Sequence, residues 1–179
     1  MRFGASMADD TCRLHPPLGG LSCGPTAVLA ITGATPATVS LEIVAAANED
    51  GEFPQHLNDS NFRHQARALE RLGFALFDLQ GHEIVVVDAI PRHRGPIAIN
   101  VLQSLSEFLR SNKSKDVLIC QGFRPVPTGL VGHTFAVDRK CYADSNTNGQ
   151  VVSISAVPVH LLDFRVLDVF AVRRERAAR

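Results

Sequence analysis

Helical and strand patterns divide this chain into two parts, and the division limits the folds that it can form. Apolar residues recur at helical spacing early in the chain, which predicts helices at 24–31, 36–48 and 60–72. Short runs of branched and aromatic residues then predict strands at 74–79, 84–87, 96–101, 117–121, 133–138, 140–144, 151–155 and 165–172. One more short helix is expected at 105–110. Helices that precede a set of short strands are typical of an α+β fold.

The length and composition fit one globular domain. The chain has 179 residues, of which 45% are hydrophobic and 20% charged, so we expect a single domain over 1–179. The segment 1–21 contains Pro16-Pro17 and Gly19-Gly20, which exclude a regular helix there and predict an extended lead-in. The segment 173–179 is rich in arginine and is expected to be a solvated basic tail without a function of its own.

Charge and hydropathy argue against two classes of partner. Eighteen Lys and Arg residues balance eighteen Asp and Glu residues, so no net charge attracts nucleic acid or an anionic membrane. The N-terminal segment lacks the apolar core of a signal peptide, and no window of the sequence has the length of a membrane span. We therefore expect a cytoplasmic protein without nucleic-acid or membrane partners. Four cysteines without paired spacing predict neither a zinc site nor a disulfide framework, and no metal or organic cofactor is expected.

Cys23 has a sequence context that the other three cysteines lack. It directly precedes the helix expected at 24–31, within the run Ser-Cys-Gly-Pro-Thr at 22–26. Unpaired amides and the macrodipole at a helix N-terminus stabilise a thiolate, which is the nucleophilic form of cysteine. Pro25 suits the first turn of a helix, and Gly24 is expected to keep the approach to the sulfur open. A cysteine also packs as a small hydrophobic residue, so this position alone does not establish a nucleophile.

His133 and Asp144 supply two further groups that a nucleophilic site needs. His133 opens an apolar strand, so the edge of a sheet can hold its imidazole in a fixed orientation for proton transfer. Asp144 ends the next strand, where adjacent antiparallel strands bring it level with His133 and its carboxylate can accept the imidazole N–H. The run 144–149 is also typical of a simple turn, and Asn146 is an alternative orienting residue.

The order of these residues resembles that of the papain-like cysteine peptidases. The resemblance rests on Cys-Gly-Pro-Thr-Ala at 23–27, on Gly132-His133 before an apolar strand, and on Tyr-Ala-Asp at 142–144. It points to the bacteriocin-processing, double-glycine peptidase-like group and covers the order and scale of nearly the whole chain. It implies a papain-like fold in which N-terminal helices, with the nucleophile on a central helix, pack on a C-terminal antiparallel sheet. It also implies Cys23 as nucleophile, His133 as general base and then acid, and Asp144 as the orienting residue.

The resemblance implies a peptidase that cleaves a peptide or isopeptide bond of a protein or peptide substrate through a thioester, without a cofactor. Two alternatives stay open. An acyltransferase or transglutaminase-like enzyme would use the same triad, and a catalytically degraded peptidase fold would act as a binding or adaptor protein. These peptidases usually have a glutamine a few residues before the nucleophile that donates to the oxyanion, but no Gln occurs between Met1 and Cys23. The amide of Cys23 and either His15 or another lead-in amide are the remaining candidate donors.

Overall fold

The computed structural model describes residues 12–17, 21–52, 61–92 and 95–175. The helices are α1 (Cys23–Thr32), α2 (Pro36–Glu49), α3 (Phe62–Arg71), α4 (Val86–Ala89) and α5 (Leu105–Ser111). The strands are β1 (Phe74–Phe77), β2 (Val117–Val126), β3 (Gly129–Asp138), β4 (Cys141–Ala143), β5 (Val152–Ser153) and β6 (Arg165–Arg174). They form one antiparallel sheet in the order β1-β6-β2-β3-β4-β5. The expected α+β class is thereby confirmed.

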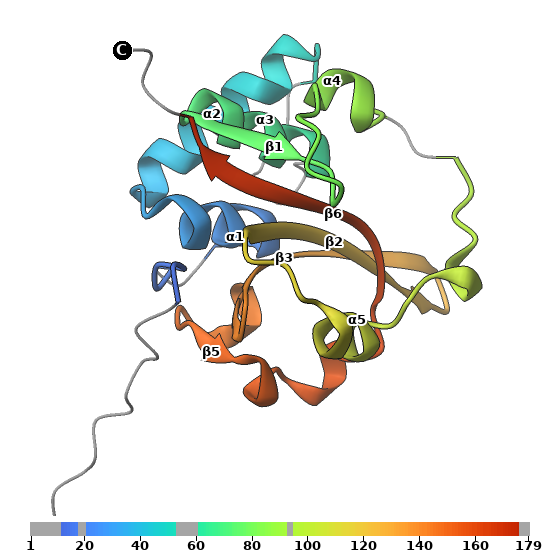
Figure 1. The fold of residues 1–179 in the computed structure, drawn as a ribbon. Helices are drawn as coiled ribbons and strands as arrows, with labels where there is room; N and C mark the ends of the chain where they lie inside the picture. The colour runs from blue at the N-terminus through green and yellow to red at the C-terminus, as the bar shows by residue number, and fades with distance from the viewer. Residues whose placement is uncertain (1–11, 18–20, 53–60, 93–94, 176–179) are drawn as a thin grey trace, which may run out of the picture.

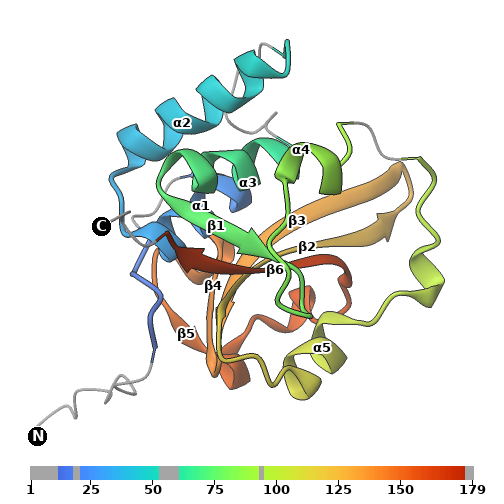
Figure 2. The same cartoon turned by 45° about the horizontal axis from the view of Figure 1, so that its top comes forward.

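The sheet separates two apolar layers, which Figure 1 and Figure 2 show from two directions. On one face lie α1 and α3, with α2 packed against them; α5 and the chain between β5 and β6 lie on the other. The first layer includes Leu29, Ile43, Leu69, Ile119 and Val172. The second layer includes Leu105, Phe108, Leu118, Phe135 and Tyr142. Because successive side chains of a strand point to opposite faces, β2 contributes to both layers.

Capping residues explain where three helices begin. Thr35 accepts a hydrogen bond from the amide three residues on, and Pro36 takes the first position of α2. Asn61 caps α3 in the same way, so this helix begins slightly later than the sequence pattern predicts. Ser104 and Glu107 form a reciprocal capping box at the start of α5. These local signals mark the first residues of the three helices.

The strands expected at 84–87 and 96–101 are wrong. The first region contains α4, preceded by a single bridge between Phe77 and Glu83, and the second contains a 3-10 turn at Ile99–Val101. Short runs of apolar residues have no periodicity that separates a strand from a helical turn, which explains both errors. The strands expected at 117–121 and 133–138 are longer than predicted, because β2 and β3 continue toward each other as one hairpin.

Within the segment expected to be an extended lead-in, residues 12–17 form neither helix nor strand. The Arg13 amide donates to Asp138 at 2.5 Å, and its guanidinium pairs with the same carboxylate at 2.9 Å. Asp138 is the last residue of β3, so this contact ties the described part of the lead-in to the sheet. The rest of the prediction for this segment lies outside the described residues.

The basic tail expected at 173–179 begins too early. Arg173 and Arg174 are the last residues of β6 and pair with β1. The Arg173 guanidinium also pairs with Asp116 at 2.8 Å. A charged residue at the end of a strand has no local signal that separates it from a tail, so tertiary pairing decides its place. The prediction for 176–179 lies outside the described residues.

The described helices are short compared with a bilayer. The longest, α2, has 14 residues, whereas a helix needs about 20 to cross the apolar core of a membrane. No single helix in the described part of the chain is long and apolar enough to span a membrane. Taken together, α1 and α2 pass the same test, but they are bent by 117° at the break between them.

Candidate active site

Cys23 is the first residue of α1, and its side chain is half-buried. Burial alone would raise the pKa of this thiol. A hydrogen bond to His133, the charge of that imidazole, and the backbone amides of Thr134 and Gly24 together lower the pKa below its ordinary value. The N-terminus of α1 and the strand that carries His133 therefore both favour the thiolate.

His133 lies within β3 and is buried, with 6% of its surface exposed. Its ring contacts Phe164 and Phe135, with centroids 5.3 Å and 6.2 Å away. Its Nε2 atom lies 2.5 Å from the Oδ2 atom of Asp144, which leaves Nδ1 for the thiol of Cys23. Burial would lower the pKa of His133, but its hydrogen bonds with Asp144 and Cys23, and the charges of both, raise it to about 9. The imidazolium form is therefore favoured at neutral pH.

Asp144 follows β4 and is completely buried. Its Oδ2 atom accepts a hydrogen bond from the Tyr142 hydroxyl at 2.8 Å, and its Oδ1 atom accepts the amide of Asn146 at 2.8 Å. Burial would raise the pKa of Asp144, but the hydrogen bond and charge of His133, with bonds from Tyr142 and Asn146, hold it below its usual range. The Asn146 side chain bonds to Asp144 at 3.3 Å, so it supports the carboxylate that faces His133.

The pairing of the strands explains how these three residues meet. β4 pairs with β3 over three residues, from Ala136↔Ala143 to Asp138↔Cys141. His133 lies beyond this pairing, while the other edge of β3 continues along β2. The start of α1 reaches β3 in this region, where the Thr134 amide donates to the sulfur of Cys23. The early end of β4 thus gives the nucleophile access to the histidine.

His15 lies at the wrong end of α1 to donate to an oxyanion at Cys23. Its amide donates to the carbonyl of Ala30 at 2.7 Å, and its ring packs against Gly33, which ends the helix. The ten residues of α1 rise by about 15 Å. The prediction that His15 supplies an oxyanion donor is therefore wrong.

Gln65 is a residue of the site region that the sequence pattern did not indicate. A Cβ atom at Gly24 would lie 2.0 Å from its Nε2 atom and 2.1 Å from its Cδ atom. Gln65 belongs to α3 and is buried, with 4% of its surface exposed. Gly24 therefore makes room for this amide, a role that differs from the open approach expected for it. No local signal marks Gln65, because the contact joins two helices that are distant in sequence.

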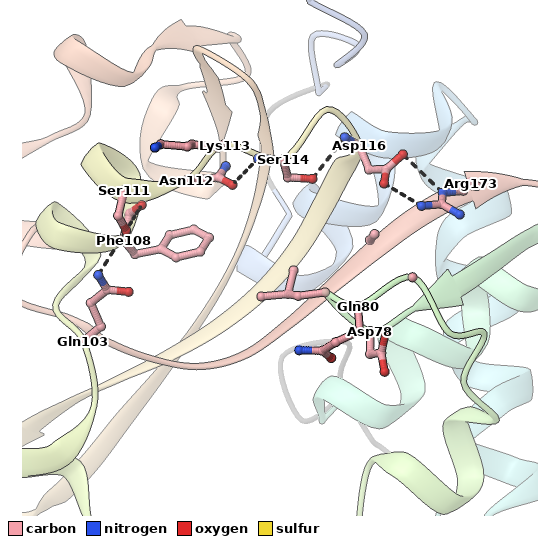
Figure 3. Close-up of a pocket in the computed structure, with 13 residues that line it drawn as sticks. Asp78, Gln80, Gln103, Phe108, Ser111, Asn112, Lys113, Ser114, Asp116 and Arg173 are labelled. Atoms are coloured by element: carbon pink, nitrogen blue, oxygen red, sulfur yellow. Dashed lines mark hydrogen bonds and ion pairs between the residues drawn. The ribbon is translucent and has the colours of Figure 1, made fainter.

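A cavity of about 420 Å³ lies in another part of the molecule (Figure 3). It is formed by the chain after β1, by α5 and the chain that follows it, and by β6, and the Asp116–Arg173 ion pair is part of its lining. None of Cys23, His133 and Asp144 lines it. This cavity is thus separate from Cys23, His133 and Asp144.

A second cavity, of about 210 Å³, adjoins the hairpin that carries His133. Gln121 and Phe123 line it, and they pair with Thr134 and Gly132, which flank His133. Its apolar walls are Phe62, Ile90, Pro91 and Phe123, and its polar walls are Asn61, Arg63, Arg92 and Gln121. This cavity is therefore next to the candidate site in the strand register.

The described residues offer no metal-binding group at the site. Within the described ranges, no cluster of three or more His, Cys, Asp or Glu side chains is arranged to hold a metal ion. Comparison of the chain with protein-family models, curated proteins and solved structures gave no match. The interpretation of function therefore depends on the geometry of Cys23, His133 and Asp144.

Proposed function

We propose that the protein is a papain-like cysteine peptidase that hydrolyses a peptide or isopeptide bond with Cys23, His133 and Asp144. One observation supports this most strongly. The imidazole of His133 bonds a buried carboxylate through Nε2 at 2.5 Å and also bonds the thiol of Cys23. This is the arrangement that activates a nucleophile, holds the histidine in one tautomer and stabilises its charged form.

Acylation begins with the thiolate of Cys23. Its sulfur attacks the carbonyl carbon of the scissile bond, and the carbonyl π electrons move to oxygen to give a tetrahedral oxyanion. As the oxyanion collapses, the imidazolium of His133 gives its proton to the leaving amine. The carbon–nitrogen bond breaks, and a thioester to Cys23 remains. Asp144 stays ionised and stabilises the imidazolium before the proton is transferred.

Deacylation uses the same residues, but His133 now acts as a base instead of an acid. The neutral imidazole takes a proton from water while the water oxygen attacks the thioester carbonyl. Collapse of the second tetrahedral intermediate breaks the carbon–sulfur bond, releases a carboxylic acid and restores the thiolate of Cys23. We expect the cavity beside the β2–β3 hairpin to hold a side chain of the protein or peptide substrate, because Gln121 and Phe123, which line it, pair with the two residues that flank His133.

Site-resolved alkylation by iodoacetamide tests the proposal. Cys12 and Cys141 are half-buried like Cys23 and serve as matched internal controls. We expect Cys23 to react much faster than either at neutral pH, and to lose this advantage in His133→Ala. Hydrolysis of a peptide library, with Cys23→Ala as the inactive control, then identifies the bond that is cleaved. A Cys23 that reacts no faster than Cys12 and Cys141 would contradict the proposal and favour a binding protein.

A further inference from the structure

The oxyanion of the proposed reaction needs hydrogen-bond donors that the triad does not supply. Such an oxyanion is stabilised by donors about 2.7–3.1 Å away, and several such sites use a backbone amide together with a side-chain amide. The backbone amide of Cys23 suits the first role, because the opening amides of a helix lack intrahelical partners. The Gly24 amide already faces the sulfur, and Pro25 has no N–H. A second donor must therefore come from another element.

Gln65 places a side-chain amide beside the backbone of the nucleophile. Its Nε2, Cδ and Oε1 atoms would lie 2.0, 2.1 and 2.6 Å from a Cβ atom at Gly24. Gly24 directly follows Cys23, so this amide lies beside the residue next to the nucleophile. His133 reaches Cys23 from β3, whereas Gln65 reaches Gly24 from α3. The two side chains thus approach the start of α1 from different elements.

Among the candidate donors, Gln65 has the chemistry and the position that fit best. His15 lies at the other end of α1, and the Thr134 amide faces the sulfur. Gln121, another buried amide of this region, lies on β2 opposite Thr134. The three atoms nearest to a Cβ at Gly24 all belong to Gln65, and none belongs to Gln121. An amide is also a neutral donor, so it can bind an oxyanion without competing with His133 for the thiolate.

We propose that the side-chain amide of Gln65 donates the second hydrogen bond to the oxyanion formed when Cys23 attacks a substrate carbonyl. The inference rests on the proposed function. It adds a catalytic residue on α3 to the triad. It also explains why residue 24 is a glycine, since a larger side chain would displace the Gln65 amide. It also explains how a chain without a glutamine between Met1 and Cys23 can build an oxyanion hole.

Two reagents separate the oxyanion hole from the thiolate. Iodoacetamide alkylates sulfur by displacement and forms no oxyanion, whereas p-nitrophenyl acetate acylates sulfur through a tetrahedral oxyanion. Gln65→Met keeps the length of the side chain and removes the amide, and Gln65→Glu keeps the shape and replaces the donor by a carboxylate. Gln103→Ala is the control, because it removes a side-chain amide at the other cavity, which none of Cys23, His133 and Asp144 lines.

We expect the acylation rate of Cys23 by p-nitrophenyl acetate to fall about 10²–10³-fold in both Gln65 variants. Alkylation of Cys23 by iodoacetamide should stay at the wild-type rate in the same proteins, which also shows that they are folded. Gln103→Ala should leave both rates unchanged. Equal acylation in wild type and the Gln65 variants would overturn the assignment, and so would a parallel loss of both reactions. A wild-type Cys23 that iodoacetamide does not modify selectively would instead overturn the proposed function.

Discussion

The Nε2 atom of His133 lies 2.5 Å from the Oδ2 atom of Asp144, and their side chains are 7% and 0% exposed. In such a buried pair the carboxylate has little competition from water, so its charge acts strongly on the imidazole. This contact helps to raise the pKa of His133 to about 9, against the effect of burial. The protonated histidine in turn lowers the pKa of Cys23. A change at Asp144 should therefore alter the pKa of Cys23.

Asp144→Asn should raise the pKa of Cys23. Without the carboxylate, His133 loses its proton at lower pH, and a neutral imidazole no longer stabilises the thiolate. The rate of alkylation of Cys23 by iodoacetamide at neutral pH should fall by about 10-fold for a rise of one pKa unit, and the midpoint of its pH profile should move upward. Asn146→Ala is the control, since it removes a hydrogen bond to Asp144 from an exposed side chain and keeps the carboxylate. If Asp144→Asn did not change the pH profile of alkylation, the carboxylate would not act on the thiol.

Tyr142→Phe tests the hydroxyl that supports Asp144. The change removes the 2.8 Å hydrogen bond from Tyr142 Oη to Asp144 Oδ2, while the ring can still stack on Phe135 with centroids 5.4 Å apart. A hydrogen bond to a charged group contributes about 1.5–3 kcal/mol, so the free energy of unfolding in urea should fall by this amount. Asp144 keeps its bonds with His133 and the Asn146 amide, so alkylation of Cys23 should fall less than in Asp144→Asn. Unchanged stability would mean that the hydroxyl does not stabilise the carboxylate.

How far the sequence predicts this site depends on whether each residue is placed by its own neighbours. Cys23 is at the start of a helix whose end is marked by Gly33, and His133 lies in a strand with clear alternation. The sequence patterns indicate both positions. The short strand β4 is almost where it was expected, which places Asp144 beside His133. The catalytic roles of the three residues remain predictions.

The features that the sequence did not reveal are made by tertiary contacts. Gln65 meets Gly24 because α3 packs on α1, and no local pattern encodes this contact. Arg173 belongs to β6 because β1 and β2 lie on either side of that strand. The helix α4 occupies an apolar run that has the composition of a strand. In each case the packing of distant segments decides between local conformations of similar propensity.

A buried ion network joins the end of α2 to α3, and we expect it to contribute to the stability of the fold. Asp50 accepts hydrogen bonds from Arg63 at 2.8 and 3.2 Å and from Arg67 at 3.0 Å, and the side chains of Asp50 and Arg63 are 2% and 7% exposed. Asp50→Ala leaves the Arg63 charge buried without its carboxylate. The free energy of unfolding should therefore fall by about 3–5 kcal/mol, as measured by urea denaturation.

The matched control for this network is Glu42→Ala. Glu42 pairs with Arg71 at 2.6 Å between the same two helices, but both side chains are partly exposed, so the loss should be about 0–1 kcal/mol. Equal losses in Asp50→Ala and Glu42→Ala would contradict the importance of burial.

The pH dependence of stability should reflect the same carboxylate. Burial would raise the pKa of Asp50, but the hydrogen bond and charge of Arg63, with the charges of Arg67 and Arg92, lower it. Because the folded-state pKa is below the unfolded-state pKa, this contribution is present above the unfolded value of about 3.9. It is lost as the pH falls through the folded value. The difference in stability between wild type and Asp50→Ala should accordingly shrink in acid, and a difference independent of pH would contradict this account.

Gly24→Ala tests whether the glycine next to the nucleophile serves Gln65. Alanine is the better helix former by about 1 kcal/mol, but its Cβ atom would lie 2.0 Å from the Nε2 atom of Gln65. The amide must then move, so we expect acylation of Cys23 by p-nitrophenyl acetate to fall about 10²-fold, as for a lost oxyanion donor. Alkylation by iodoacetamide should stay unchanged.

The decisive comparison is the double variant of Gly24→Ala and Gln65→Met. If the glycine acts only by making room for the amide, adding Gly24→Ala to Gln65→Met should cause no further loss, because both changes remove the same interaction. If Gly24 instead keeps the approach to the sulfur open, the two losses should add, and alkylation by iodoacetamide should fall with acylation. The four proteins of this cycle therefore separate a glycine that makes room for Gln65 from a glycine that admits the substrate.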